Sequence, residues 1–293
     1  MHPLLVVILV AAAVAAFCWI ASLISHDHSW VDRLWSIVPV VYVWIFAGFA
    51  GFADIRLDVM AGLVTLWGAR LTFNFARKGG YNGVEDYRWP VLRERFGPAK
   101  FAVFNILFVV IYQHALLVLI TLPALTAYEH RETPFGILDL IVTLVFLGFL
   151  VGETIADQQQ WNFQKAKQAT IAAGGIPTSQ FVTSGLWSFS RHPNFFFEQA
   201  QWWTLFFFGA IAAGSLLQWT VLGAALLTGL FVGSTIFTES ITKSKYPEYA
   251  DYQARVSPIV PWIPRRRSVT ATDRKSTRLN SSHRALSRMP SSA

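Results

Sequence analysis

The stretch SRHPNFFFEQAQWWTLFFFGAIAA, residues 190–213, carries polar side chains on a segment that is otherwise apolar and long enough to cross a membrane. Asn194, Glu198 and Gln201 follow one another at i, i+4 and i+7, so they share one face of a helix. A carboxylate on an apolar membrane helix costs about 2.5–3.5 kcal/mol even on lenient insertion scales, and it persists where it faces a protein interior, a ligand or a wet cavity. Because Arg191 stands at the entrance to this helix, the stretch predicts the mouth of a site for a polar, anionic ligand at the membrane.

The composition of the whole chain is that of a membrane protein. Hydrophobic residues make up 54% and charged residues only 14%, whereas a soluble domain carries about 25% charged residues. The first apolar run has no basic residues before it and exceeds the apolar core of a signal peptide, so we interpret it as a retained helix. We expect an all-α polytopic membrane protein with about seven transmembrane helices, near residues 4–25, 34–53, 57–76, 102–126, 135–156, 194–212 and 216–238.

The net charge of +7 comes from the C-terminal end. Residues 265–293 hold eight of the 24 Lys and Arg residues and one of the 17 Asp and Glu residues, so residues 1–264 are formally neutral. The charge therefore does not indicate a nucleic-acid partner. We expect one transmembrane domain over 1–264 and a disordered, Ser- and Arg-rich tail over 265–293. From about residue 271 the tail resembles translated cloning or adaptor sequence; the alternative is a basic tail that touches anionic lipid.

The distribution of basic residues between the loops predicts the orientation. Loops after an even number of spans carry only Arg56 and Arg131, whereas the other loops carry most of the Lys and Arg residues. The positive-inside rule then places the N-terminus outside and the C-terminus in the cytoplasm. Nearly all polar clusters fall on the cytoplasmic side, so we expect a site that faces the cytoplasm.

The loop GGYNGVEDYRW, residues 79–89, follows the third apolar run. Its two glycines can end a helix and let the backbone approach a ligand closely. The aromatic residues interleaved with the charges indicate that the loop covers something. The alternative is an ordinary cytoplasmic loop with solvated charges at Glu85, Asp86 and Arg88.

Two carboxylates lie four residues apart at the cytoplasmic end of the fifth span. Glu153 and Asp157 share a helical face, where like charges repel. One interpretation has Asp157 at the headgroup level, paired with Lys165 or Arg191. The other has it hold a hydroxyl or amide group of a ligand.

Two further features allow a functional and a structural interpretation each. Arg191 and His192 precede a helix start at Pro193, and helix N-termini bind anions; the alternative for Arg191 is positive-inside anchoring. Asp32 is either an acid or hydrogen-bond partner inside the cavity, or the N-cap of the second span. We do not expect a metal, since the residues around Asp32 do not match a known ligand spacing.

Four stretches together resemble bacterial membrane proteins allied to steroid 5α-reductases, whose wider superfamily includes sterol reductases and isoprenylcysteine carboxyl methyltransferases. They are DRLWS (32–36), RLTFNFARKGGYNGVEDYRW (70–89), ETIADQQQWNF (153–163) and SGLWSFSRHPNFFFEQAQWW (184–203). The resemblance implies a seven-helix bundle in a bacterial inner membrane that binds NADPH from the cytoplasm and reduces the double bond of an enone-type lipid or steroid-like substrate. It implies cofactor contacts at Asn74, Gly79, Gly80, Tyr81, Asp86, Arg88, Asp157, Arg191, His192, Asn194, Glu198 and Tyr246.

One departure from the family concerns the acid. Steroid 5α-reductases carry a His-Tyr pair shortly before the third-helix arginine, whereas Trp67, Gly68 and Ala69 precede Arg70 here. Another acid must then supply the proton, and Asp32 and Tyr87 are the candidates. Two other classes stay open: an S-adenosylmethionine-dependent membrane methyltransferase of isoprenylcysteine type, and a non-enzymatic lipid or sterol binder. The oligomeric state and the identity of the substrate are not readable from the sequence.

Overall fold

The computed structural model describes residues 1–83 and 85–265, and the regular elements over these residues are all helices. The expected tail, apart from Arg265, lies outside the described residues. The first half of the chain forms α1 (Pro3–Ser25), α2 (Trp30–Leu34), α3 (Val38–Phe49), α4 (Ile55–Arg77), α5 (Arg88–Phe104), the π-helix η1 (Asn105–Tyr112), α6 (Gln113–Thr121) and α7 (Pro123–Glu129). The second half forms α8 (Ile137–Ala172), the short 3-10 helix η2 (Gly185–Ser188), α9 (Pro193–Ala213), α10 (Val221–Lys245) and α11 (Tyr249–Arg255).

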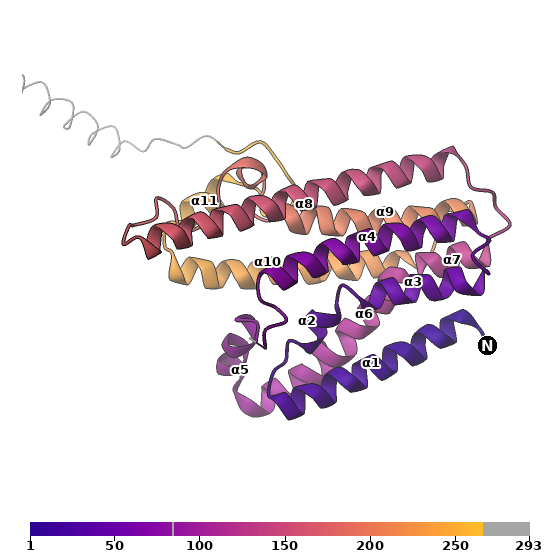
Figure 1. Cartoon of the computed structure of the whole chain (residues 1–293), viewed down its shortest axis with the longest axis horizontal. Helices are drawn as coiled ribbons and strands as arrows, with labels where there is room; N and C mark the ends of the chain where they lie inside the picture. The colour runs from indigo at the N-terminus through magenta and orange to yellow at the C-terminus, as the bar shows by residue number, and fades with distance from the viewer. Residues whose placement is uncertain (84, 266–293) are drawn as a thin grey trace, which may run out of the picture.

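The long helices lie side by side as a bundle, with α4, α8, α9 and α10 running along its length (Figure 1). Helix α9 is at the centre, because it packs against α7, α8, α10 and α4. Twelve of its 21 residues are buried, whereas only five of the 36 residues of α8 are. The stretch with the polar stripe therefore forms the interior helix.

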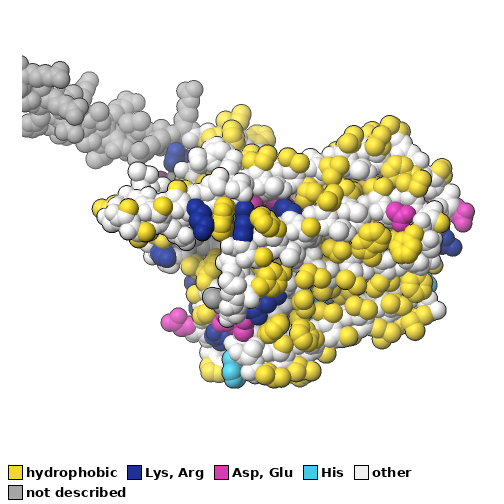
Figure 2. Space-filling view, in the orientation of Figure 1, with side chains coloured by type: hydrophobic (Ala, Val, Ile, Leu, Met, Phe, Trp, Pro, Cys, Tyr) yellow, Lys and Arg dark blue, Asp and Glu magenta, His cyan; other side chains and the backbone are white. Residues whose placement is uncertain are grey.

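The exterior of the bundle is apolar, as a lipid-facing surface requires. Helices α1 and α8 expose large hydrophobic side chains along most of their length. Most charged side chains on the face seen in Figure 2 gather toward the end where α8 terminates and α5 lies, with a smaller group at the opposite end. The bundle thus has an apolar body with one strongly polar end.

Five helical segments are long and apolar enough to cross a membrane: α1, α4, α8, α10 and the run Arg88–Thr121, which is kinked at Gly97. The prediction of an all-helical membrane protein is confirmed, whereas the count of seven spans and the orientation stay predictions. Helix α3 has only 12 residues, which gives a length of about 18 Å, short of a hydrocarbon core of about 30 Å. Helix α8 is about 54 Å long at 1.5 Å per residue, so it continues far beyond the expected end near residue 156.

A buried ion pair joins the N-terminal ends of α4 and α8. Arg56 Nε lies 2.6 Å from Asp139 Oδ1 and its Nη2 lies 2.9 Å from Asp139 Oδ2, and both side chains are 1% exposed. The guanidinium also donates to the backbone oxygens of Thr133 and Pro134 at 3.0 Å. Arg56 therefore fixes the loop before α8 as well as the helix itself.

Candidate functional site

One guanidinium near the polar end of the bundle gathers three carboxylates from two other helices. Arg70 on α4 places its Nη1 2.6 Å from Asp157 Oδ2, and its Nη2 2.8 Å from Glu153 Oε1 and 3.2 Å from Glu198 Oε2. All four side chains are at most 10% exposed. We name these four residues the Arg70 cluster.

The neighbouring side chains complete the hydrogen bonding of the two glutamates. The indole nitrogens of Trp67 and Trp202 lie 3.0 Å and 3.4 Å from Glu198 Oε1. Gln201 Nε2 donates to Glu153 Oε2 at 2.6 Å and to a backbone oxygen one turn earlier. Trp67, three residues before Arg70, therefore acts as a donor to a buried carboxylate.

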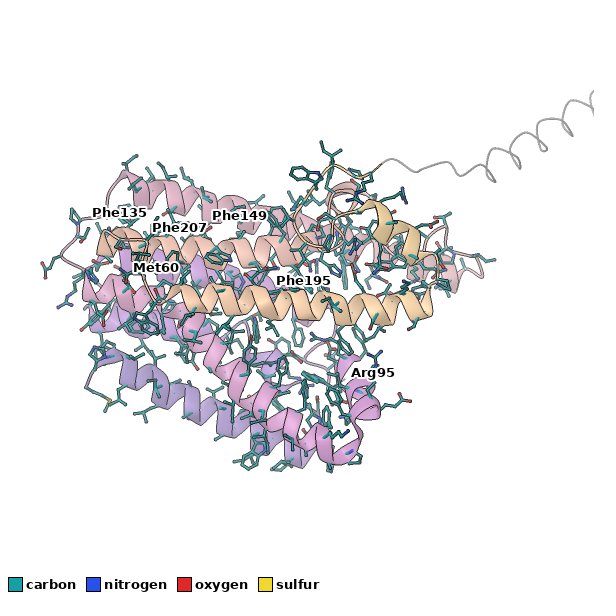
Figure 3. The ribbon with its side chains drawn as sticks, turned by 180° about the vertical axis from the view of Figure 1, so that it is seen from behind. Met60, Arg95, Phe135, Phe149, Phe195 and Phe207 are labelled. Atoms are coloured by element: carbon teal, nitrogen blue, oxygen red, sulfur yellow. The ribbon has the colours of Figure 1, made fainter. Side chains whose placement is uncertain are left out.

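Close approach of α8 and α9 brings the cluster together. A Cβ at Gly152 on α8 would lie 2.6 Å from the Phe197 ring on α9, so only glycine permits this contact. Glu153 follows this glycine directly, and the four-residue spacing puts Asp157 on the same face. In Figure 3, Phe149 lies in the region where α8 passes α9, and its ring packs on Phe196 and Phe197.

Several buried acceptors around the cluster have no partner within the described residues. They are Oε1 of Gln201, Oε1 of Gln160 and Oδ1 of Asn194. The Nε–H of Arg70 is the corresponding unpaired donor. Because a buried polar group left without a hydrogen bond costs about 1–3 kcal/mol, this end of the bundle can accept hydrogen bonds from the N–H or O–H groups of a ligand.

Arg191 is held by the protein itself. Its Nε lies 2.6 Å from Glu239 Oε1 and its Nη2 lies 3.0 Å from Glu239 Oε2. Its Nη1 donates to the backbone oxygens of Gln253, at 3.0 Å, and of Val256. We name this arrangement the Arg191 clamp: it joins the start of α9 to α10 and to the segment around α11. Phosphate binding by Arg191 stays a prediction, but four of its five N–H groups already have protein acceptors.

Other residues add to the Arg191 clamp. His192 Nε2 and the Tyr249 hydroxyl each lie 3.1 Å from Glu239 Oε1. Burial and the adjacent carboxylate raise the pKa of Tyr249, which keeps its hydroxyl a donor. Tyr246 is the C-cap of α10, and the ammonium of Lys167 lies 5.1 Å from the centroid of the Tyr246 ring. His192 and Tyr246 therefore lie at the same end as the Arg70 cluster without entering it.

Asp32 belongs to a second polar group, formed by α2 and the loop after α4. Its Oδ2 accepts from Trp89 Nε1 at 3.1 Å, and its Oδ1 lies 3.5 Å from Arg88 Nη2. Burial raises the pKa of Asp32 to about 6 against the lowering effect of Arg88. The N-cap interpretation is wrong, because Ile37 precedes α3 in the expected second span and Asp32 lies within the first turn of α2.

The loop of residues 79–89 is tied to α2. Arg33 Nε donates to the Gly80 oxygen at 3.1 Å, and the Tyr81 hydroxyl donates to the Arg33 oxygen at 3.1 Å. Gly79 has φ +85°, and a Cβ at Gly80 would lie 2.3 Å from the Phe75 ring, so both positions require glycine. The expected cofactor contacts in this loop thus lie in a folded network, and their binding role stays a prediction.

The idea that the loop charges are solvated is wrong for Glu85. Its carboxylate lies 2.7 Å and 2.5 Å from the two terminal nitrogens of Arg93, and it also accepts from the His28 backbone at 3.0 Å. Although burial opposes the effect, these hydrogen bonds lower the pKa of Glu85. Asp86 is paired with Arg88 at 2.7 Å, whereas Tyr87 is 58% exposed.

The pairing expected for Asp157 at the headgroup level is wrong, whereas a ligand contact at Asp157 stays a prediction. Asp157 pairs with Arg70 and not with Lys165 or Arg191. Lys165 instead lies over the Trp161 ring at 4.7 Å. Asn74 is buried, and its Oδ1 accepts from Arg77 Nε at 2.9 Å.

Four residues of the site were missing from the expected contacts: Arg70, Glu153, Gln201 and Trp67. The spacing of Arg70, Asn74 and Arg77 put them on one face of α4, and this was the available signal. The sequence does not say which helix that face meets, so the partners of Arg70 were not readable.

A protein-family model described as a protein of unknown function, DUF1295, matches residues 18–256. The chain belongs to this family. The matched range holds the whole Arg70 cluster and ends at Val256, whose backbone oxygen accepts from Arg191. The chain is also 38% identical to the uncharacterized protein C594.04c of Schizosaccharomyces pombe over 275 residues, which cover 89% of this chain and 80% of the relative. No solved structure matches the chain.

The relative is fungal, so a bacterial source and the inner-membrane location stay predictions. What the family model and the helices show is an integral membrane protein of the DUF1295 family.

Proposed function

We propose that this protein is a membrane oxidoreductase that uses NADPH to reduce the C=C bond of an enone-type lipid or steroid-like substrate. The observation that carries the proposal is the set of buried, unpartnered acceptors beside the Arg70 cluster, on Gln160, Asn194 and Gln201. The carboxamide and the ribose hydroxyl groups of a nicotinamide nucleotide donate the hydrogen bonds that these oxygens lack.

The cations at the same end fit the phosphate groups of such a cofactor. Lys78 follows α4 directly and is exposed. Arg77 and Lys165 both lie over the Trp161 ring, with their charged groups 4.9 Å and 4.7 Å from the ring centroid. Phosphate recognition by these side chains leaves the Arg191 clamp intact, which favours them over Arg191.

When bound, the nicotinamide group supplies the hydride. The chain's own residues would orient the cofactor through the unpartnered acceptors, and an acid would polarise the substrate carbonyl. Asp32 is a candidate for this acid, because a pKa near 6 keeps about one molecule in ten protonated at pH 7. Tyr87 is the other candidate, since a phenol is protonated at neutral pH and can donate a hydrogen bond.

The first test is nucleotide binding by the purified full chain. NADPH is expected to bind the wild type, and Asn194→Ala is expected to weaken binding about 5- to 100-fold, the range for a lost buried hydrogen bond. Asn162→Ala on α8 is the control, because Asn162 is exposed and bonds only to Gln158 among the described residues. Unchanged affinity in Asn194→Ala would contradict the assignment of this site. A screen of enones for NADPH consumption then identifies the substrate class, and Asp32→Asn should lower turnover while leaving NADPH affinity near that of the wild type.

One observation favours the methyltransferase alternative. The Arg70 cluster sets three carboxylates against one guanidinium, and an excess of acceptors suits the cationic sulfonium of S-adenosylmethionine. S-adenosylmethionine is therefore compared with NADPH in the same binding experiment. Binding of S-adenosylmethionine alone would replace the reductase proposal by the methyltransferase.

A further inference from the structure

The charges of the Arg70 cluster do not balance. Asp157, Glu153 and Glu198 would carry three negative charges when ionised, against one positive charge on Arg70. All four groups are at least nine-tenths buried, where α4 and α8 pack against the central helix α9. An uncompensated buried charge costs several kcal/mol, so this arrangement needs a further positive charge.

The other charged side chains nearby do not supply it. On α4, Arg77 directs its three donor nitrogens to Asn74, Gln158 and the backbone oxygen of Asp157. Lys78, just beyond the end of α4, acts on Asp157 and Glu153 through space without pairing with either among the described residues, and with its charge counted the cluster still has one negative charge in excess.

The neighbouring helices do not supply the charge either. On α8, Lys165 lies over Trp161. At the start of α9, Arg191 is paired with Glu239 of α10.

Glu153 and Glu198 are the members of the cluster that compete most directly for the positive charge of Arg70. Glu153 and Glu198 approach the same atom, Nη2 of Arg70, at 2.8 Å and 3.2 Å. Their carboxyl groups therefore lie within about 6 Å of each other, a distance at which two like charges disfavour double ionisation. Asp157 has the other terminal nitrogen of Arg70 to itself, at 2.6 Å.

A second observation indicates that the Arg70 cluster lacks a hydrogen-bond donor beside Gln201. Gln201 is fully buried, its amide nitrogen donates to Glu153 at 2.6 Å, and its Oε1 finds no donor among the residues that the structure describes. A protonated carboxyl group beside Glu153 is a donor, whereas an ionised one accepts only. An added proton thus lowers the charge and brings a donor to the acceptor-rich side of the cluster.

We infer that Glu153 and Glu198 share one proton at neutral pH, and that the Arg70 cluster is a proton-binding site inside the membrane domain. The shared proton belongs to the pair and not to one residue. The inference does not depend on the identity of the cofactor, because it follows from the contacts of the cluster itself.

Infrared spectroscopy of the full chain tests the inference directly. At pH 8, where Asp32 is almost fully ionised, the wild type is expected to show the C=O band of a protonated, buried carboxyl group that shifts in heavy water. Glu153→Gln and Glu198→Gln each remove one negative charge, so both are expected to lose the band. The control Glu132→Gln, at an exposed position before α8, is expected to keep it.

Absence of the band from the wild type, or its persistence in both variants, overturns the inference. Selective ¹³C labelling of the glutamate carboxyl groups gives a second measurement that needs no substitution: the band must shift with the label. NADPH binding is measured on the same samples. A band in protein that does not bind NADPH supports the proton site and overturns only the proposed reductase; NADPH binding without a band does the reverse.

Discussion

At the scale of single residues, the ion pair between Arg56 and Asp139 is the contact whose loss is easiest to predict. Asp139→Ala leaves a guanidinium buried at 1% exposure without its carboxylate, so we expect a loss of about 3–5 kcal/mol in stability. Thermal unfolding in detergent measures this loss. The double variant Arg56→Met/Asp139→Leu removes both charges and should recover part of it. A single variant as stable as the wild type would show that the pair does not fasten α4 to α8.

Asp32 makes a prediction about pH. Its folded pKa of about 6 exceeds the value of about 3.9 in an unfolded chain, so the folded state binds this proton more tightly. The resulting stabilisation is complete below about pH 4 and is lost as the pH rises through 6. Relative to the wild type, Asp32→Asn should therefore gain about 2 kcal/mol between pH 4 and pH 7.

The comparison with a variant is necessary because Asp27 and Glu85 act in the opposite direction. Hydrogen bonds lower the pKa of both, although burial opposes this, so their stabilisation is lost as the pH falls. Melting temperatures of wild type and Asp32→Asn across this pH range isolate the effect of Asp32. Asp251→Asn, at an exposed position, is expected to show no such difference.

At the scale of the elements, glycines set how closely α10 packs. A Cβ at Gly223 would lie 2.3 Å from the Leu119 oxygen on α6, whereas a Cβ at Gly229 would meet no atom within 4 Å. Gly223→Ala should therefore cost about 1–3 kcal/mol by forcing the helices apart. Gly229→Ala should be neutral or stabilising by up to about 1 kcal/mol, because alanine is the better helix former. Equal melting temperatures for the two variants would contradict this packing.

The sequence located the helices well but not their lengths or breaks. Hydrophobic runs found each long helix, since a membrane span needs a continuous apolar stretch. They did not show that α8 continues to Ala172, because its final turns are polar and owe their helicity to propensity. The Gly97–Pro98 pair is a sequence signal for the turn at Gly97, which has φ +72°. The π-helix after it was not readable, because its residues are as apolar as those of an α-helical span.

At the scale of the whole molecule, the orientation in the membrane remains to be tested. We expect the N-terminal end of α8 outside and its C-terminal end in the cytoplasm, from the excess of Lys and Arg at the latter. Cys18 is the only cysteine and is buried, so a Cys18→Ser background permits single labels. On intact cells, an impermeant maleimide should react with Glu132→Cys and not with Lys165→Cys until the cells are opened. The reverse pattern would invert the topology.

The same scale explains why only part of the site was predictable. The polar stripe of α9 correctly indicated an interior face, because a buried carboxylate on a membrane helix needs a partner. The partner itself lies 128 residues away in the chain, as Arg70 does from Glu198. A single sequence shows which faces are polar, whereas three-dimensional packing decides which faces meet.

The Arg191 clamp has a consequence for biosynthesis. Arg191 binds backbone oxygens 62 and 65 residues further along the chain. During synthesis, α9 therefore reaches the membrane long before these two backbone oxygens leave the ribosome. Until then the guanidinium of Arg191 must be solvated in the aqueous headgroup region. A message that ends before codon 253 would yield a protein with every long helix and the Arg191–Glu239 pair in place, but without the two backbone acceptors of Nη1. Such a protein would be fully inserted but would lack the contacts between Arg191 and the segment around α11. Degradation rather than loss of insertion would then set its abundance.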